Sequence, residues 1–481
     1  MKIEHLDVDS AINNAKQLIA DESDLSPALR SALEVLLLLV SVLLNRVTLT
    51  SKNSSKPPST DPNRLKPTRK TSDKSTGAQK GHIGTTLEKV SHPDVIKRIK
   101  LDRRTLPRGS YQEAGVETRQ VFDIDIARVV TEYQAQVLVN DQGKRFVAAF
   151  PDGVTKAVQY GNQIKAHAVY LSQYQLLPYK RIQEYFADQL AIPLSEGSLY
   201  NFNQQAFVQL AEFEQISKDQ LAQATVAHAD ETGVNINGKG HWLHCTSNTE
   251  WTHYFPHAKR GTEAMNEIGI LPRFKGVLCH DHWKPYYHYE FTHALCNAHH
   301  LRELTRAWEQ DKQAWAEKMG QLLKTINKAV DEAGGVLDTD QAEHYRQIYR
   351  SLLKKAEKEC QPPKRPPGEV KRGRLKRSKA RNLLERLMNY ETDVLRFMVN
   401  HQVPFTNNQG ENDIRMTKVH QKISGCFRSL DGAKGFCRVR GYLSTCRKQG
   451  VSAALAMGLV FDGKPPDFCS GARASAVTDA E

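Results

Sequence analysis

The segment from Thr225 to Trp283 constrains the fold most, because its side-chain pattern changes in a defined order. Residues 225–238, 239–248 and 250–257 alternate as antiparallel strands do, and Asn237-Gly238 between the first two is a strong hairpin turn. A helix follows at 262–274, and the apolar run GVLCHDHW predicts a short buried strand. The order of three strands, helix and strand predicts an α/β core.

Two acidic residues lie on strands of this core and a third lies on a later helix. Alternation places His228 and Asp230 on one face of the first strand, and Cys279 and Asp281 on one face of the last. If these strands are neighbours, the two carboxylates meet at their ends. Glu411 follows within NNQGENDIRMTKVH. Two strand carboxylates and one helix carboxylate can hold two divalent metals, so the pattern predicts cutting and joining of nucleic acid.

Glu411 has two simpler interpretations. Asn408 could cap the helix with Glu411 as its capping-box partner, or Glu411 could pair with Arg415 at i+4. A metal-binding role is favoured because a row of cations shares or extends the helical face of Glu411. A carboxylate beside such cations suits a bound phosphate backbone. The cations are Arg415, Lys418, Lys422 and Arg428.

The 130 positions between Asp281 and Glu411 contain a predicted helical insertion that leaves the core and returns to it. Between its helices, nine basic residues lie from Lys364 to Arg381 against one acid, Glu369. A solvated loop is the alternative, but contact with DNA is favoured beside a nuclease-like site. The candidate DNA contacts in this loop are Lys371, Arg372, Arg374, Lys376 and Arg377.

Composition agrees with a nucleic-acid partner. The chain of 481 residues has 67 Lys plus Arg against 54 Asp plus Glu, a formal charge of +13. Such basicity attracts phosphate backbones, although it can also serve solubility alone. The apolar run from Val35 to Leu44 is too short to span a bilayer, and no secretory signal is present. Eight scattered cysteines without a C-x-x-C pair predict reduced thiols in a cytosolic protein.

The residues before the core fall into four segments. Residues 1–50 predict a Leu-rich helical segment that must be covered by another helix of its own chain or of a partner. Residues 51–90 predict a flexible basic arm, for which a solvated linker is the alternative. Residues 91–157 predict a small β-rich module, and residues 158–220 a helical domain. The remaining parts are the core, 221–305 plus 401–445, its insertion, 306–400, and a C-terminal segment, 446–481.

The second and third helices of the 158–220 domain have the proportions of a helix-turn-helix. Ser195 is placed to cap the third helix. An ordinary helical pair is the alternative, because such pairs are common in proteins that never touch DNA. If the motif binds DNA, Lys180 and Arg181 lie near phosphates. The residues near the start of the third helix that would then face DNA are Ser198, Tyr200, Asn201 and Asn203.

Histidines and cysteines crowd the core, so a zinc hydrolase has to be considered. Cys296-x-x-His299 is only half of a zinc pattern, and neither an H-E-x-x-H motif nor a second spaced pair accompanies it. His299 and Arg302 are therefore predicted to orient the site or to contact phosphate, with a packed helix face as the alternative.

Four motifs together resemble, in order, the core of the IS66-type transposases of bacterial insertion sequences. They are HADETG, CHDHWKPYY, CNAHHLREL and NNQGENDIRMTKVHQKISGCFRS. SSKPPSTDPNR, GAQKGH and LPYKRIQEYFADQLAIPLSEGSLYNF resemble the N-terminal regions of that family, so the likeness covers nearly the whole chain. The family commonly carries a cysteine-paired zinc module after the arm. Residues 92–150 contain no cysteine, so zinc is not expected there.

The resemblance implies a ribonuclease-H-like core with a long helical insertion and a DDE triad of Asp230, Asp281 and Glu411. It implies a DNA transposase that uses two Mg²⁺ ions, with Mn²⁺ as a substitute. Expected partners are the inverted-repeat ends, target DNA, further copies of the chain and accessory proteins of the same element, in the bacterial cytoplasm at the nucleoid. The rival functions are a nuclease or resolvase that cuts without joining, and an inactive DNA-binding relic.

Overall fold

The structure is a computed structural model that describes residues 2–3, 6–22, 24–47, 50, 52–54, 61, 87–363 and 375–469. Most of the predicted basic arm at 51–90 lies outside the described residues. The same holds for Lys371, Arg372 and Arg374 of the predicted basic loop.

The N-terminal segment forms two helices after a short strand pair, β1 (Lys2–Ile3) and β2 (Leu6–Asp7). Helix α1 (Val8–Asp21) contacts α2 (Pro27–Val47), and Ser26 caps α2 by accepting the N–H of Leu29 at 3.2 Å. Several leucines of α2 remain more than half exposed, Leu38 at 63% among them. Helix α1 therefore does not bury the leucines of α2 by itself. Their burial against a helix of another chain stays a prediction.

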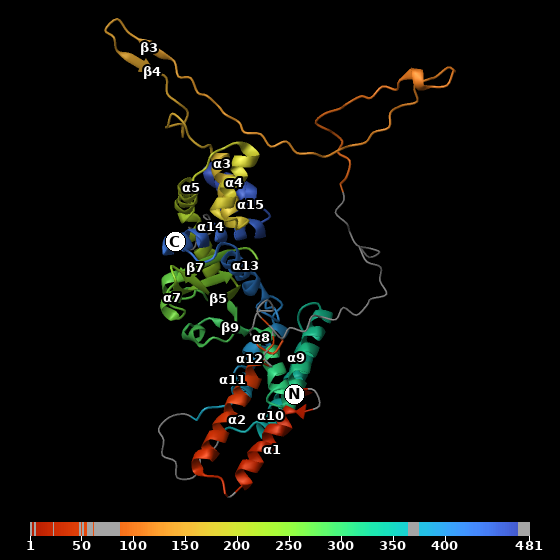
Figure 1. Cartoon of the computed structure of the whole chain (residues 1–481), viewed down its shortest axis with the longest axis vertical. Coiled ribbons are helices and arrows are strands. Elements are labelled where there is room, and N and C mark those ends of the chain that lie inside the picture. Colours follow the sequence, from red (N-terminus) through yellow and green to blue (C-terminus); the bar gives the residue numbers. More distant parts are fainter. Residues whose placement is uncertain are drawn as a thin grey trace.

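Residues 87–157 do not form the predicted β-rich module. In this described segment the regular elements are one 3-10 turn, η2 (Arg103–Thr105), and one hairpin of β3 (Val137–Val139) and β4 (Arg145–Val147). The segment extends away from the rest of the chain (Figure 1). Its apolar side chains are solvent-exposed, Val129 at 87% for example, so no core is available to stabilise further strands.

A helical group follows as predicted. It consists of α3 (Asn162–Val169), the π-helical turn η3 (Tyr170–Tyr174), α4 (Tyr179–Leu190), α5 (Glu196–Gln209) and α6 (Ala211–Ala222). Ser195 caps α5 by accepting the N–H of Ser198 at 3.0 Å, which confirms that part of the prediction. These helices share a hydrophobic core with the C-terminal helices α14 (Leu430–Lys448) and α15 (Ala453–Phe461).

The central element is a five-stranded mixed sheet in the order β7-β6-β5-β8-β9. Its strands are β5 (Val226–Ile236), β6 (Lys239–Ser247), β7 (Thr252–His257), β8 (Val277–His280) and β9 (Thr292–Leu295). Strands β5, β6 and β7 are antiparallel neighbours, whereas β5, β8 and β9 run parallel. Asn237 and Gly238 have φ of 49° and 75°, the left-handed values that a tight hairpin turn needs, so the predicted turn is confirmed.

Helices cover both faces of this sheet. Ala227, Ala229 and Leu278 pack with Met265 of α7 (Thr262–Ile268) on one face. On the other face, which carries Asp230, the strands pack against α13 (Asn408–Ser424) and α14. Helix α13 contacts β5 and β6 directly. The face with the strand carboxylates therefore meets the helix that carries Glu411.

Most of the described residues between β9 and α13 form helices. They are α8 (Asn297–Glu309), α9 (Ala314–Glu332), α10 (Thr339–Glu359), α11 (Lys379–Asn389) and α12 (Glu391–Leu395), followed by the turn η5 (Arg396–Met398). They form one hydrophobic cluster with Cys279, Ala294 and Leu295 of the sheet. Figure 1 shows these helices on the opposite side of the sheet from α3, α4 and α15. The chain thus leaves the sheet after β9 and returns to it at α13.

Candidate active site

Parallel pairing of β5 with β8 brings Asp230 and Asp281 to the same level of the sheet. The register pairs Val226 with Val277 and His228 with Cys279, and its continuation by two residues sets Asp230 beside Asp281. Each carboxylate is oriented by a main-chain donor. Asp230 Oδ1 accepts the N–H of Glu231 at 2.9 Å, and Asp281 Oδ1 accepts the N–H of Trp283 at 3.0 Å.

Asn407 fixes the start of α13 over the same face of the sheet. Its side chain is buried, lies 2.7 Å from His228 Nδ1 through Oδ1, and donates from Nδ2 to the carbonyl of Ala229 at 2.9 Å. Its main-chain N–H points to Cys296 Sγ at 3.1 Å. Because the N–H of Glu411 bonds to the carbonyl of Asn407 at 3.1 Å, these contacts also set the position of Glu411.

The simpler interpretations of Glu411 are wrong. The helix begins at Asn408 with Asn407 as its cap residue, and no side chain caps it, so the capping box is absent. The ion pairs found among the described residues join Glu411 Oε1 to Arg302 at 3.6 Å and to His299 at 3.7 Å, not to Arg415. Glu411 is therefore directed across to α8.

The negative charges of the acids at this site affect the ionisation of Asp230. Burial raises the pKa of Asp230 to about 8, and the charges of Glu231, Asp281 and Glu411 contribute to that shift. Carboxylates that oppose one another's ionisation in this way concentrate negative charge at one place. A cation would relieve this repulsion, and oxygen ligands of this kind are what Mg²⁺ prefers.

Glu231 is also part of this site, although it was not among the residues predicted from the sequence. Burial raises its pKa to about 7, against the opposing effect of its hydrogen bonds. The carboxylate accepts a short hydrogen bond from the Tyr286 hydroxyl and one from Arg260 at 3.2 Å. The alternation of side chains along a strand assigns Glu231 to the opposite face of the sheet from Asp230. The strand pattern therefore did not place Glu231 with the other acids. Two consecutive acids on a buried strand were the available signal.

Arg260 links Glu231 to Asp281. Its guanidinium lies 3.9 Å from Asp281 Oδ2 and stacks between two indole rings, with its central carbon 4.8 Å from the Trp242 ring centroid and 4.1 Å from that of Trp283. Planar stacking on both sides holds the guanidinium in one orientation. Arg260 therefore limits where the Asp281 carboxylate can point.

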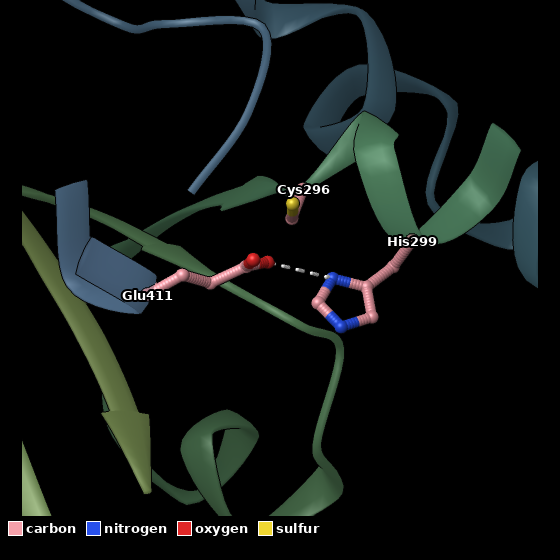
Figure 2. A group of neighbouring side chains, drawn as sticks. All are labelled: Cys296, His299 and Glu411. Atoms are coloured by element: carbon pink, nitrogen blue, oxygen red, sulfur yellow. Dashed lines mark ion pairs between the residues drawn. The ribbon is translucent and has the colours of Figure 1, made fainter. Parts of the chain in front are cut away.

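His299 and Arg302 lie where a supporting role requires. Both project from α8 towards Glu411, and Figure 2 shows the ring nitrogen of His299 facing the carboxylate. Among the described residues, Glu411 Oε1 and His299 Nδ1 are buried polar atoms without a hydrogen-bond partner. Buried polar atoms usually have a hydrogen-bond partner or contact a bound water or ion. A carboxylate oxygen that lacks a hydrogen bond fits a metal ligand.

A cationic pocket adjoins this cluster. It has a volume of about 350 Å³, and its lining includes His299, Arg302, Arg306, Lys379 and Arg386. Some of this charge is already paired, because Arg306 bonds to Asp311 and Arg386 to Glu303. The remaining excess suits an anionic backbone that approaches the carboxylates from the α8 and α11 side.

The predicted helix-turn-helix contacts are only partly available. Lys180, Arg181, Tyr200 and Asn201 are exposed, and Ser198 is half-buried beside Ser195. Asn203 was predicted to face DNA, and this is wrong. It is buried, and its amide bonds to Ser172, Gln173, Tyr179 and the carbonyl of Leu199. Asn203 lies one turn after buried Leu199, so it shares the face of α5 that packs inward.

The cations predicted to contact DNA on and after α13 differ in whether they are already hydrogen-bonded within the chain. Arg415 and Lys422 on α13 and Arg428 beyond its end are exposed. Lys418 is exposed too, but it donates to the carbonyl of Gly233 at 2.5 Å. In the described end of the basic loop, Lys376 is exposed and Arg377 forms an ion pair with Glu385.

Comparison with known proteins decides the family. The model of the Transposase IS66 family matches residues 157–435, more than half of the chain. The chain belongs to the IS66 transposase family. The match includes Asp230, Asp281 and Glu411, and membership implies DNA transposition by DDE-type cleavage and transfer, for which the family generally uses a divalent metal.

Two further findings accompany the match. A family of unknown function, DUF6444, matches residues 5–88 of this transposase. None of the curated proteins matches this chain.

The mixed five-stranded sheet with its many helices is consistent with a ribonuclease-H-like transposase core. No helix of the described residues has the length and apolarity to cross a membrane.

Proposed function

We propose that this transposase cuts the ends of an insertion sequence and joins them to target DNA at Asp230, Asp281 and Glu411. The observation that carries the proposal is the convergence of these acids from β5, the end of β8 and α13, where the charges of Asp281 and Glu411 help to raise the pKa of Asp230. A ribonuclease-H-like fold of residues 221–305 plus 401–445, with 306–400 as its insertion, belongs to the same proposal.

The three acids would hold two Mg²⁺ ions, or Mn²⁺ in their place. When bound, the ions supply activation of the attacking oxygen and stabilisation of the leaving 3′ oxygen. The chain's own residues set the geometry. Main-chain N–H groups fix one oxygen each of Asp230 and Asp281, while Asn407 fixes the turn that carries Glu411. Arg260 lies near the carboxylate of Asp281, and Arg302 and His299 pair with the carboxylate of Glu411.

DNA would approach along the exposed cations. Arg415 and Lys422 lie along α13 and Arg428 lies beyond its end, while α8 and α11 contribute the cationic pocket. Lys180, Arg181, Tyr200 and Asn201 of the helical pair would add a second DNA contact. The proposed partners are the element ends, target DNA, further copies of the chain and accessory proteins of the element, at the bacterial nucleoid.

The test uses the purified full chain with labelled inverted-repeat ends, a plasmid target and Mg²⁺. We expect cleavage that leaves a 3′ hydroxyl and covalent transfer of the label to the plasmid. Cleavage without transfer would favour a nuclease or resolvase. Binding that persists while cleavage and transfer are both absent would favour the inactive relic.

Replacing Arg415 and Lys422 together by alanine should weaken binding to end DNA and flatten its salt dependence. If each contacts one phosphate, the slope of log affinity against log salt should fall by about 2. The matched control is the double alanine variant of Lys354 and Lys355, two exposed lysines of α10. It makes the same change in net charge. Equal slopes for the two variants would show that α13 does not contact the backbone.

A further inference from the structure

A second set of metal-ligand types meets at Glu411. The ligand atoms of Cys296, His299 and Glu411 all lie within 4.8 Å of one another. Cys296 is the cap residue of α8, His299 lies in the first turn of α8, and Glu411 lies in the first turn of α13 (Figure 2). The sequence showed only the Cys-x-x-His half, and the fold supplies the third residue from 112 positions further along the chain.

The spacing suits a small tetrahedral ion. Metal–N and metal–O distances near 2.0 to 2.1 Å place neighbouring ligand atoms about 3.4 Å apart. His299 Nδ1 lies 3.7 Å from Glu411 Oε1, so this pair already approaches that separation. Within the 4.8 Å limit of the whole group, closure around an ion needs only small side-chain movements.

Two of the three ligand atoms lack a hydrogen bond within the described part of the chain. Glu411 Oε1 and His299 Nδ1 have no hydrogen-bond partner among the described residues, although both are buried atoms. The Sγ atom of Cys296 accepts the main-chain N–H of Asn407 at 3.1 Å. Donors around a cysteine sulfur stabilise its thiolate, the form that binds metals.

The ligand chemistry selects the ion. Thiolate and imidazole suit Zn²⁺ and other borderline ions, whereas Mg²⁺ takes oxygen ligands. A Zn²⁺ ion with one thiolate, one carboxylate and a neutral imidazole leaves no net charge. The guanidinium of Arg302, 3.6 Å from Glu411, is compatible with such a site.

We propose that Cys296, His299 and Glu411 form a site for one Zn²⁺-type ion, with a fourth position left to water. Glu411 is shared between this site and the carboxylates of Asp230 and Asp281. Zn²⁺ at Cys296 and His299 would therefore withdraw Glu411 from the catalytic set and inhibit strand cleavage. The inhibitory consequence rests on the proposed function, while the binding of the ion does not.

Cobalt binding to the metal-free full chain tests the site. Co²⁺ bound to a thiolate gives a charge-transfer absorption band, and added Zn²⁺ should abolish it. We expect Cys296→Ser to lose the band and to bind Zn²⁺ at least about tenfold more weakly in competition with a coloured chelator. The matched control is Cys426→Ser, which removes an exposed thiol elsewhere and should keep the band and the affinity.

Two further variants keep the test independent of any folding defect in Cys296→Ser. Glu411→Gln and His299→Gln should retain the thiolate band but weaken Zn²⁺ binding. A band that survives in Cys296→Ser, or Zn²⁺ binding that is unchanged in all three variants, would overturn the site. Cleavage with Mg²⁺ alone is measured separately, so a chain that cleaves without showing the band refutes only the zinc site. A chain that shows the band without cleaving refutes only the proposed function.

Discussion

Asp230→Asn, Asp281→Asn and Glu411→Gln should each reduce cleavage of labelled element ends by about a thousandfold or more. Each change removes one carboxylate charge from the set that would hold two divalent ions, and metal stabilisation of the transition state is worth several kcal/mol. Binding of end DNA should be retained, because affinity depends on cations outside the carboxylate cluster. Gel assays of cleavage and of binding on the same preparations measure both effects.

Glu317→Gln is a matched control for Glu411→Gln, because Glu317 is the first-turn glutamate of α9 as Glu411 is of α13. It should cleave as the unmodified chain does. Asp340→Asn, at an exposed aspartate in the first turn of α10, serves the same purpose for the aspartates. Full cleavage by Glu411→Gln would remove Glu411 from the triad, whatever the aspartates do.

Gly276→Ala should strongly destabilise the core. A Cβ at this position would lie 2.3 Å from the carbonyl oxygen of Ala224, 2.5 Å from that of Thr225 and 2.9 Å from the Phe274 ring. Main-chain oxygens cannot rotate away, so β8 would have to separate from β5. We expect a loss of about 3 kcal/mol in the free energy of unfolding, measured by denaturant titration. Cleavage should fall as well, because β8 carries Asp281 to Asp230.

Gly240→Ala is the matched control, because a Cβ on that strand glycine meets no atom within 4 Å. Its unfolding midpoint should stay close to that of the unmodified chain. If Gly276→Ala unfolds at the same midpoint as Gly240→Ala, the close approach of β8 to the start of β5 is incorrect.

Local signals predicted much of the core. The Asn237-Gly238 turn, the cap at Ser195 and the order of strands and helix around Asp230 depend on nearby residues, and the structure agrees. Alternation then placed Asp230 correctly on the face that α13 covers. These features follow from chain geometry over a few residues, which a single sequence expresses directly.

Contacts between distant segments were beyond such signals. Asn407 joins α13 to β5, and Arg260 joins Glu231 to Asp281, through side chains whose partners no local pattern identifies. Asn203 was misassigned because it shares a helix with exposed Tyr200 yet points into a polar core. Within 91–157 the structure has one short strand pair, because strand propensity alone provides no packing partner for further strands.

Iron-directed cleavage of the polypeptide tests whether Asp230, Asp281 and Glu411 share a metal site. Fe²⁺ replaces Mg²⁺ at oxygen-ligand sites, and with ascorbate and peroxide it generates hydroxyl radicals that cut the main chain beside the bound ion. We expect cuts near Asp230, Asp281 and Glu411 in the full chain, suppressed by excess Mg²⁺ and lost in Asp230→Asn. Cuts that avoid residues 230 and 281, or that Mg²⁺ does not suppress, would contradict a shared metal site of these three acids.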